Sequence, residues 1–459
     1  MMKKVQSSKF KVDGECFILI ITRFSFSIFL FILFSSGAFS QEIINLQKAL
    51  QTGLGNNFSI LLQKNDFQIA KNNNTLGNAG FLPSVALNVA QNNTISTTHQ
   101  EQFSGTVKDV DNAKNNTLNI GVQANWTVFD GLNMFIAKKM LGVFEDLGEN
   151  GTRIVMEGFV SDVSVAYYGI IQLGKLVQVA REALDLSKQR KMIAEAKVSL
   201  GSGSQLMLMQ STVDMNADST RLIQQLMALT NLHAEFNRLL GRDIDIPFVI
   251  QDSISFSGIK PFDTILHLSL VQNAQLIAAR LNQDIARLGV NQAQSERYPQ
   301  VSLTAGYNYN TLNSQTGFLQ YNRSYGPSYG ITLTYNLFNG FNVTRAINNA
   351  KVILNSGDLE IQDTELILKS ALVRLQNEFQ SNLQIVELQH TNVQVAEENV
   401  AIAFEKYKLG TINDIELREI QRKLIDAEYQ LIASQYEVKK AEIEISRYSG
   451  ELLKNINPE

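Results

Sequence analysis

Residues 126–133 read WTVFDGLN, and residues 335–342 read YNLFNGFN. They belong to a repeat in which residues 126–241 and 335–450 correspond at a constant offset of 209 positions. The same offset relates KVSLG at 197–201 to KYKLG at 406–410. Upstream the offset is 216, which relates FLPSV at 81–85 to RYPQV at 297–301, so the first copy carries seven extra residues. An insertion confined to one connection is typical of a loop, and a period this long argues against a solenoid.

The repeat predicts the order of the elements. Each copy reads as a helix, two strands separated by a variable loop, a long helix, a sharp turn and a returning helix. We expect the first structural repeat over residues 41–246 and the second over 263–452. A linker at 247–262 would join them, and residues 453–459 would form a C-terminal tail.

The first forty residues are predicted to be a secretory signal peptide. Basic residues up to Arg23 precede an apolar stretch at 24–34, and Ala38-Phe39-Ser40 gives the small-x-small pattern before Gln41. A retained membrane anchor is the alternative, but the apolar run is shorter than the ~20 residues that a spanning helix needs. Cys16 is the only cysteine. The chain beyond residue 40 therefore offers no disulfide, thiol nucleophile or thiolate metal site.

Charge and hydropathy narrow the class of protein further. The formal net charge is −4, or −7 when the first forty residues are left out, so nucleic acid is not an expected partner. Beyond residue 40 we find no apolar run of the length of a transmembrane helix. An exported chain of this kind is secreted, periplasmic, or inserted in a membrane as strands.

Four segments alternate between apolar and polar side chains with a period of two, which predicts strands at about 84–95, 117–129, 300–310 and 328–338. The polar faces hold small uncharged residues. The apolar faces carry aromatic residues, namely Trp126, Tyr307, Tyr309, Tyr329 and Tyr335. This pattern is typical of an outer-membrane β-barrel, although a soluble sheet covering a core produces the same alternation. The connections at about 91–116 and 311–326 are expected to be loops that face outward.

Two long helices are predicted, over about 358–408 and 152–200. At ~1.5 Å per residue, fifty residues make a rod of roughly 75 Å, for which a globular domain has no room. Each helix ends at a Leu-Gly pair, and Gly201 and Gly410 are expected to cap the tips of two helical hairpins. We expect Gly148 and Gly357 to mark a break at the start of each long helix.

The strand count predicts an oligomer. Four strands cannot close, since ~8 is the smallest transmembrane barrel and its interior is filled by side chains. Open strand edges are not tolerated in lipid. Three copies would give twelve strands and a water-filled lumen, which the polar inner faces favour.

The chain resembles the outer-membrane efflux protein family of TolC-like channels. The resemblance rests on LPS at 82–84 and YPQ at 298–300 entering a strand, on the aromatic-x-x-Phe-Asp/Asn-Gly signatures at 126–131 and 335–340, and on YKLGT at 407–411. It implies a mixed α and β membrane protein: a homotrimer in which four transmembrane strands per protomer form a twelve-stranded β-barrel. A long periplasmic α-helical barrel would continue it.

The resemblance also implies a function. The chain would be the passive outer-membrane channel of a tripartite efflux or type I secretion system, with most of the helical part in the periplasm. Its partners would be a periplasmic adaptor (membrane fusion) protein, an inner-membrane transporter and outer-membrane lipid. An exported helical adhesin or scaffold with a soluble β-sheet is the alternative function.

The family's pattern also suggests site residues. Glu416 and Glu419 occupy the positions that narrow the periplasmic aperture, and a trimer would place two rings of three carboxylates around its axis. Tyr407 matches the tip tyrosine. At Ile412 some relatives carry an arginine that ties the closed tip, so this particular lock is absent here. An ordinary solvated helix face, alongside Asp414, Arg418 and Arg422, is the alternative reading of the two glutamates.

Two further points complete the sequence reading. The strand-to-helix turns are expected at Asp130 and Gly131 and at Asn339 and Gly340. The four histidines are scattered and show no metal-ligand spacing, and we find no phosphate loop and no nucleophile elbow. We therefore expect no catalytic residues, no metal and no cofactor.

Overall fold

A computed structural model describes residues 42–316 and 319–454 of this chain. The expected signal peptide and most of the expected C-terminal tail lie outside these residues. The chain divides into two units. The described part of the small unit pairs two-residue strands in parallel, β1 (Glu42–Ile43) with β4 (Phe248–Val249). All other elements belong to the large unit, residues Asn45–Ile246 and from Asp252 onward.

The large unit runs through the same order of elements twice, as the sequence repeat predicts. The first series is α2 (Leu46–Asn56), α3 (Phe58–Asn73), β2 (Ser84–Glu101), β3 (Val107–Asp130), α4 (Asn133–Ser199) and α5 (Gln205–Leu239). The second series is α6 (Phe262–Gln272), α7 (Ala274–Ser295), β5 (Gln300–Ser314), β6 (Tyr321–Thr334), α8 (Asn342–Lys408) and α9 (Asp414–Tyr448). Both α4 and α8 have 67 residues, and both α5 and α9 have 35.

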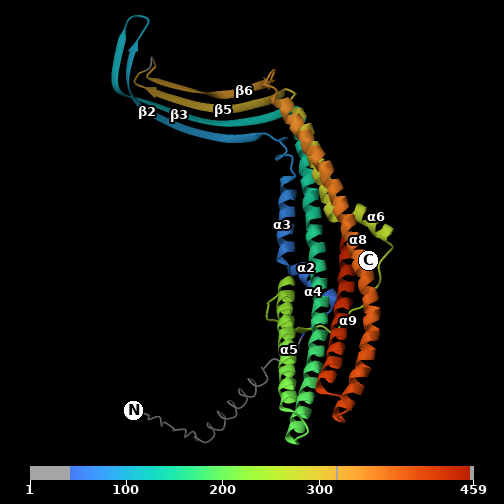
Figure 1. Cartoon of the computed structure of the whole chain (residues 1–459). Coiled ribbons are helices and arrows are strands. Elements are labelled where there is room, and N and C mark those ends of the chain that lie inside the picture. Colours follow the sequence, from blue (N-terminus) through green and yellow to red (C-terminus); the bar gives the residue numbers. More distant parts are fainter. Residues whose placement is uncertain (1–41, 317–318, 455–459) are drawn as a thin grey trace, which may run out of the picture. The chain divides into compact units, whose positions relative to one another are not determined.

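The four long strands form one antiparallel sheet in the order β2-β3-β5-β6 (Figure 1). Strands β3 and β5 join the two series, from Asn115 opposite Ser314 to Asp130 opposite Gln300. Within the described residues, β2 and β6 each pair on one side only, so both edges of the sheet are open. Strand β6 ends at Thr334, four residues before the predicted end, and the second aromatic signature from Tyr335 therefore follows the strand.

Both segments that the sequence predicted to be outward loops contain paired strands, which corrects that expectation. In the second segment, Thr311–Asn313 pair with Tyr321–Arg323. Strands β2 and β3 continue as a two-stranded ribbon in which Thr98–Glu101 pair with Val107–Val110. A register shift between Ser96 and Thr98 and a left-handed Asn112 (φ 54°) interrupt the ladder. Strand β3 pairs with β5 only from Asn115 onward, so the outer ribbon has neighbours on one side alone. Its polar sequence lacks the apolar alternation by which strands are recognised.

The long helices are continuous, so the expected breaks at Gly148 and Gly357 are wrong. Both glycines lie inside their helices, α4 and α8. A Cβ atom at Gly148 would lie 3.3 Å from the Cα of Phe67 in α3, and one at Gly357 would lie 3.4 Å from the Cα of Gln283 in α7. Each glycine thus permits a close approach between the long helix and the shorter helix beside it.

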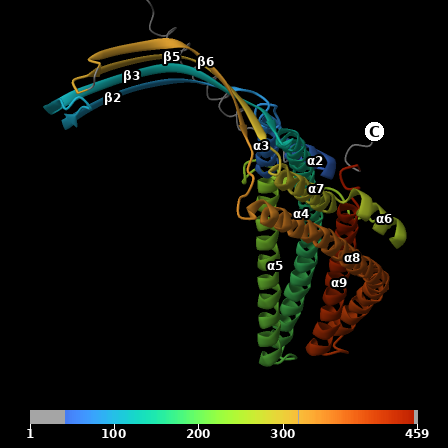
Figure 2. The ribbon, with the colours of Figure 1, turned by 90° about the horizontal axis from the view of Figure 1, so that it is seen from above.

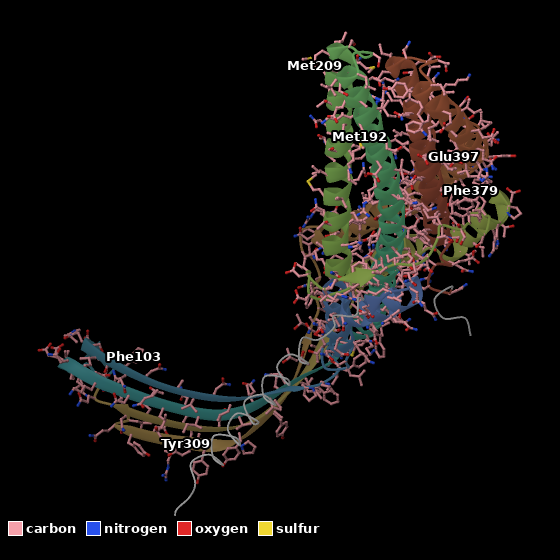
Figure 3. The ribbon with its side chains drawn as sticks, turned by 90° about the horizontal axis from the view of Figure 1, so that it is seen from below. Phe103, Met192, Met209, Tyr309, Phe379 and Glu397 are labelled. Carbon is pink, nitrogen blue, oxygen red and sulfur yellow. The ribbon has the colours of Figure 1, made fainter. Side chains whose placement is uncertain are left out.

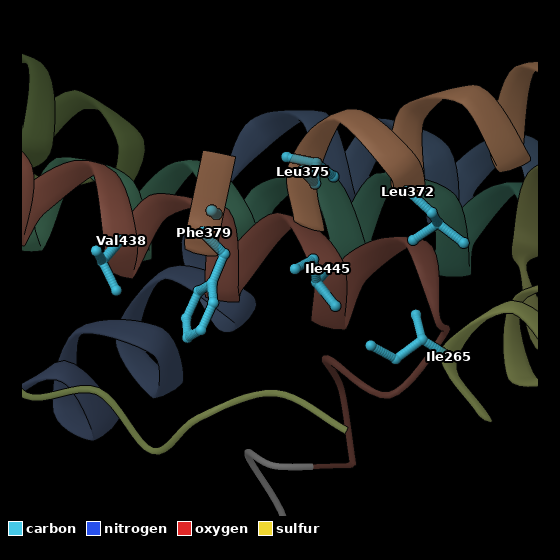
Figure 4. Close-up of a cluster of buried hydrophobic side chains, with 7 residues drawn as sticks. Ile265, Leu372, Leu375, Phe379, Val438 and Ile445 are labelled. Carbon is cyan, nitrogen blue, oxygen red and sulfur yellow. The ribbon is translucent and has the colours of Figure 1, made fainter. Parts of the chain in front are cut away.

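Each long helix packs against its returning helix as an antiparallel hairpin, α4 with α5 and α8 with α9 (Figures 1 and 2). Between α8 and α9 the core holds Leu372, Phe379, Val438 and Ile445, and Ile265 of α6 joins it (Figure 4). Helix α4 contains an 18-residue window with a mean hydropathy of 1.4, of which 61% is buried inside the protein. Among the described residues, α4 alone passes the test for a membrane span by length and composition, contrary to expectation, but its burial is that of a core helix.

Candidate functional site

The two hairpin tips have the same backbone geometry, and glycine makes it possible. Gly201 (φ 72°) donates to the carbonyl of Val198, and Ser202 donates to that of Lys197. Gly410 (φ 77°) and Thr411 make the corresponding bonds, 209 positions on. This is a Schellman motif, whose left-handed residue is usually glycine because a side chain there is strained. Both predicted tip glycines therefore lie where the sequence placed them.

Tyr407, near the tip of the second hairpin, contacts residues of both hairpins. Its side chain is buried, and its hydroxyl donates to Asp414 Oδ1 at 3.2 Å. Lys197 of the other hairpin donates to the Tyr407 carbonyl at 3.1 Å and places its ammonium 4.2 Å from the ring centroid. Burial, followed by the neighbouring Asp414, raises the pKa of Tyr407 to about 12. The phenol therefore stays protonated, and remains a donor, across the physiological pH range.

Arg190 of α4 lies between two aspartates from different helices. Its side chain is 0% exposed, and it forms ion pairs with Asp214 of α5 and with Asp414 of α9. Arg190 Nε lies 3.0 Å from Asp414 Oδ1. A buried guanidinium needs such partners, since removing one of them leaves a charge without compensation. The ion pair with Asp414 joins the first hairpin to the second.

Arg418 of α9 also joins the two hairpins, here with the arginine on the second hairpin and the aspartate on the first. It donates to Asp218 of α5 through both terminal nitrogens, at 2.8 and 2.9 Å. Ser187 of α4 donates to the same carboxylate. Burial alone would lower the pKa of Arg418, but the hydrogen bond and charge of Asp218 outweigh it and raise that pKa. We refer to Ser187, Arg190, Asp214, Asp218, Tyr407, Asp414 and Arg418 together as the polar layer.

The sequence did not predict the polar layer. Its alternative reading grouped Asp414 and Arg418 with a solvated face, which is wrong: Asp414 is 7% exposed and the Arg418 side chain 15%. Ser187 and Arg190 stand three residues apart on the stripe of α4 that also buries Ala183 and Ala194. The signal available in the sequence was a charged residue, Arg190, on an otherwise apolar stripe of a predicted helix. The partner of such a residue is not visible in one sequence.

Glu416 and Glu419 do not join the polar layer. Both side chains are exposed, one turn apart, while Leu417 between them is fully buried. Asn413 caps α9 by accepting from the Glu416 amide at 2.8 Å. Ile412 packs instead against the cluster of Ala403, Tyr407 and Leu417. Convergence of the two carboxylates on a pore axis stays a prediction.

The strand-to-helix turns use two consecutive left-handed residues. They are Gly131 and Leu132 in the first series (φ 72° and 71°), and Gly340 and Phe341 in the second (66° and 60°). A Cβ atom at Gly131 would come within 2.3 Å of the Ser295 carbonyl oxygen, so only glycine fits there. Within the part of the chain that the structure describes, Asp130 Oδ1 is buried without a hydrogen-bond partner. In the same residues no group of three His, Cys, Asp or Glu side chains forms a metal site.

Solved outer-membrane proteins share this fold. The Campylobacter jejuni CmeC outer membrane channel has a TM-score of 0.75 and 16% identity, covering 90% of this chain and 87% of its own. The outer membrane protein VceC of Vibrio cholerae has a TM-score of 0.70 and 16% identity, covering 88% of this chain and 96% of its own. This chain thus shares the fold of these two proteins, a sheet continued by long helical hairpins.

Sequence comparison also points to outer-membrane efflux proteins. Residues 265–451 match the model of the family described as outer membrane efflux protein. The outer membrane protein TolC of Vibrio cholerae serotype O1 is 21% identical over 232 residues, which are 49% of this chain and 52% of TolC. The match thus spans about half the length of that relative. The predicted resemblance is confirmed. The predicted outer-membrane localisation with a large periplasmic helical part agrees with these relatives, and the matched family is one of channels rather than enzymes.

Proposed function

We propose that this protein is the exit duct of a tripartite efflux or type I secretion system. It would conduct substrates passively across the outer membrane, from an inner-membrane transporter and a periplasmic adaptor protein. The observation that carries the proposal is the four-stranded sheet, which has two open edges and one bare apolar face.

The apolar face of the sheet has the chemistry of a lipid contact. Its side chains stand exposed on strands β2, β3 and β6; they include Val85 (69%), Val89 (62%), Trp126 (43%), Tyr329 (91%) and Ile331 (73%). A soluble protein rarely exposes so many contiguous apolar side chains. The opposite face carries polar cross-strand contacts such as Asn308 to Ser328 at 3.2 Å. Outer-membrane lipid on one side and a watery lumen on the other account for both faces.

The open edges call for further copies of the chain. Edge strands with unsatisfied backbone groups do not persist in lipid, and β2 of one protomer can pair with β6 of the next. Three protomers would close twelve strands. The helices also leave apolar surface for neighbouring copies: Leu206, Val213, Ile223 and Met227 on α5, and Val352, Leu359, Leu366 and Ile367 on α8 are exposed. A homotrimer would cover both helix faces in a common α-helical barrel.

The hairpin tips would form the periplasmic aperture. The polar layer holds the two hairpins of one protomer together, and Glu416 and Glu419 would narrow the passage with negative charge. Loosening of the tips around Gly201 and Gly410 would open it. A groove of about 810 Å³ between α8 and α9, lined by Asn392, Val395, Ile420, Lys423 and Asp426 among others, is a surface on which an adaptor helix would fit.

Conductance in planar lipid bilayers tests this function. We expect the purified protein to form cation-preferring channels, because acidic side chains line the aperture. The double variant Glu416→Gln/Glu419→Gln should lower the preference for K⁺ over Cl⁻, whereas Glu405→Gln, which neutralises an exposed glutamate on α8 before the tip, should leave it unchanged. Absence of channels in the wild type and in Arg190→Met, which breaks the polar layer, would refute the proposal.

A further inference from the structure

A second feature lies between the hairpins, one to two helical turns away from the polar layer. The buried residues Leu176, Val179 and Ala183 of α4 pack against Ile425 and Ile432 of α9. We call this contact the seam. It is the apolar part of the surface along which the first hairpin meets the second.

Glu428 is part of the seam by its position on the helix. It follows Ile425 by three residues and precedes Ile432 by four, so all three lie on the same face of α9. Its side chain is partly buried. A carboxylate placed among aliphatic side chains loses hydration, and its ionised form is therefore disfavoured.

The charges around Glu428 add to this effect. The groups that act on it are Glu182 of α4 and Glu397 of α8, both exposed and both acidic (Figure 3 labels Glu397). On α9 its neighbour Tyr429 is uncharged at neutral pH, and Arg221 of α5 lies 6.0 Å from the ring of that tyrosine. Within residues 42–316 and 319–454, Glu428 forms no ion pair. The charges that act on Glu428 thus come from acidic side chains of two neighbouring helices, α4 and α8.

We propose that Glu428 makes the seam a pH-sensitive joint, which packs while this carboxyl is protonated and loosens when it ionises. The direction follows from linkage. Burial, followed by Glu182 and Glu397, raises the pKa of Glu428 from 4.5 to about 7. The packed seam therefore binds the proton more tightly than the open seam does. Packing is strongest below pH 4.5, weakens as the pH rises towards about 7, and carries the full penalty above that value.

The joint itself does not depend on the proposed function, but its consequence does. If the hairpins open an aperture, a neutral or alkaline periplasm favours the loosened seam and an acidic one the packed seam. The three tip residues Tyr407, Arg190 and Asp414 belong to a separate contact, and the phenol of Tyr407 stays protonated in this range.

Hydrogen exchange of the detergent-solubilised protein, compared between variants at the same pH, tests the joint. At pH 8 the amides of 176–183 and 425–432 should exchange several-fold faster in the wild type than in Glu428→Gln, and at pH 4 the two should agree. Glu428→Lys should also slow exchange at pH 8, because an ammonium would pair with Glu182 and Glu397. Glu398→Gln, at an exposed position of α8, is the matched control and should follow the wild type.

Equal exchange of wild type and Glu428→Gln at pH 8 would overturn the proposal, as would an equal effect of Glu398→Gln. Unchanged protection of α2 and α3 confirms that each variant is folded. The outcome is separate from the duct, since a pH-sensitive seam in a protein that forms no channel would leave this inference standing and refute only the proposed function.

Discussion

At the scale of single residues, Arg190 joins the two hairpins through a buried ion pair with Asp414. It is completely buried and pairs with aspartates of α5 and α9. Replacing one partner of a buried ion pair typically costs about 3–5 kcal/mol, because the remaining charge is stranded. Arg190→Met should therefore separate the tips and raise single-channel conductance.

Lys188→Met is the matched control for this first prediction. Lys188 lies two residues away on α4, is 54% exposed, and pairs with Asp185 at 3.0 Å on the surface. Exposed pairs contribute little, so its conductance should remain that of the wild type. Equal conductance of Arg190→Met and Lys188→Met would show that the polar layer does not hold the tips closed.

The hydroxyl of Tyr407 permits a milder test of the same contact. Tyr407→Phe keeps the ring under the Lys197 ammonium but removes the donor to Asp414. We expect a loss of about 1 kcal/mol in tip stability, the usual net value of one hydrogen bond. Because the pKa of Tyr407 is raised to about 12, the difference between variant and wild type should be constant from pH 5 to 9. Hydrogen exchange of the amides at the tips measures this difference in stability. A difference that changes between pH 5 and 9 would contradict the assignment.

The residue scale also shows where a single sequence is informative. Gly201, Gly410 and Tyr407 could be placed at the tips because their roles are local, a left-handed cap and a position near it. Arg190 and Asp414 are 224 positions apart, and the sequence around either residue does not indicate that the two are in contact. Contacts between the two hairpins belong to the tertiary structure, which explains why the polar layer and the position of Glu428 in the seam were missed.

At the scale of elements, replacing glycine with alanine should have opposite effects on stability at two positions of the first hairpin. Gly201 has φ +72°, which an alanine adopts at a cost of about 1 kcal/mol or more. Gly174 lies inside helix α4, where an added methyl group would meet open space among the described residues, and alanine there should stabilise the helix by up to ~1 kcal/mol. Thermal unfolding in detergent should therefore rank Gly174→Ala above wild type and Gly201→Ala below it. The reverse order would refute the cap assignment.

The β2–β3 ribbon permits a deletion. Ser96 pairs with Ala113, and pairing between β3 and β5 begins only at Asn115. Replacing residues 97–112 with Asn-Gly, a favoured two-residue hairpin turn, should leave the oligomer and its conductance intact. Loss of the oligomer, measured by native mass spectrometry, would show that the ribbon takes part in assembly.

The elements also show what periodicity can and cannot predict. Alternation located the four strands, because each has one apolar and one polar face. It failed for the ribbon, whose two faces are both polar, and it overextended β6 to 338 because Tyr335 and Leu337 continue the pattern beyond Thr334. Glycine was misread as a helix break at Gly148 and Gly357, where its lack of a side chain instead admits a neighbouring helix.

At the scale of the whole molecule, the account depends on one number, the count of chains in the assembly. A sheet with two open edges, an exposed apolar face and helices with uncovered apolar surface is an incomplete structure as a single chain. Three copies would complete the barrel with twelve strands, whereas two would close eight strands around a filled interior. The residue and element predictions on conductance presuppose this assembly.

The most direct measurement is the mass of the complex extracted from outer membranes in detergent, by native mass spectrometry or by light scattering corrected for bound detergent. The account predicts a membrane-bound species with three times the mass of one chain. A soluble monomer would contradict it, because the four strands would then form an ordinary sheet and no channel would exist for the tips to close.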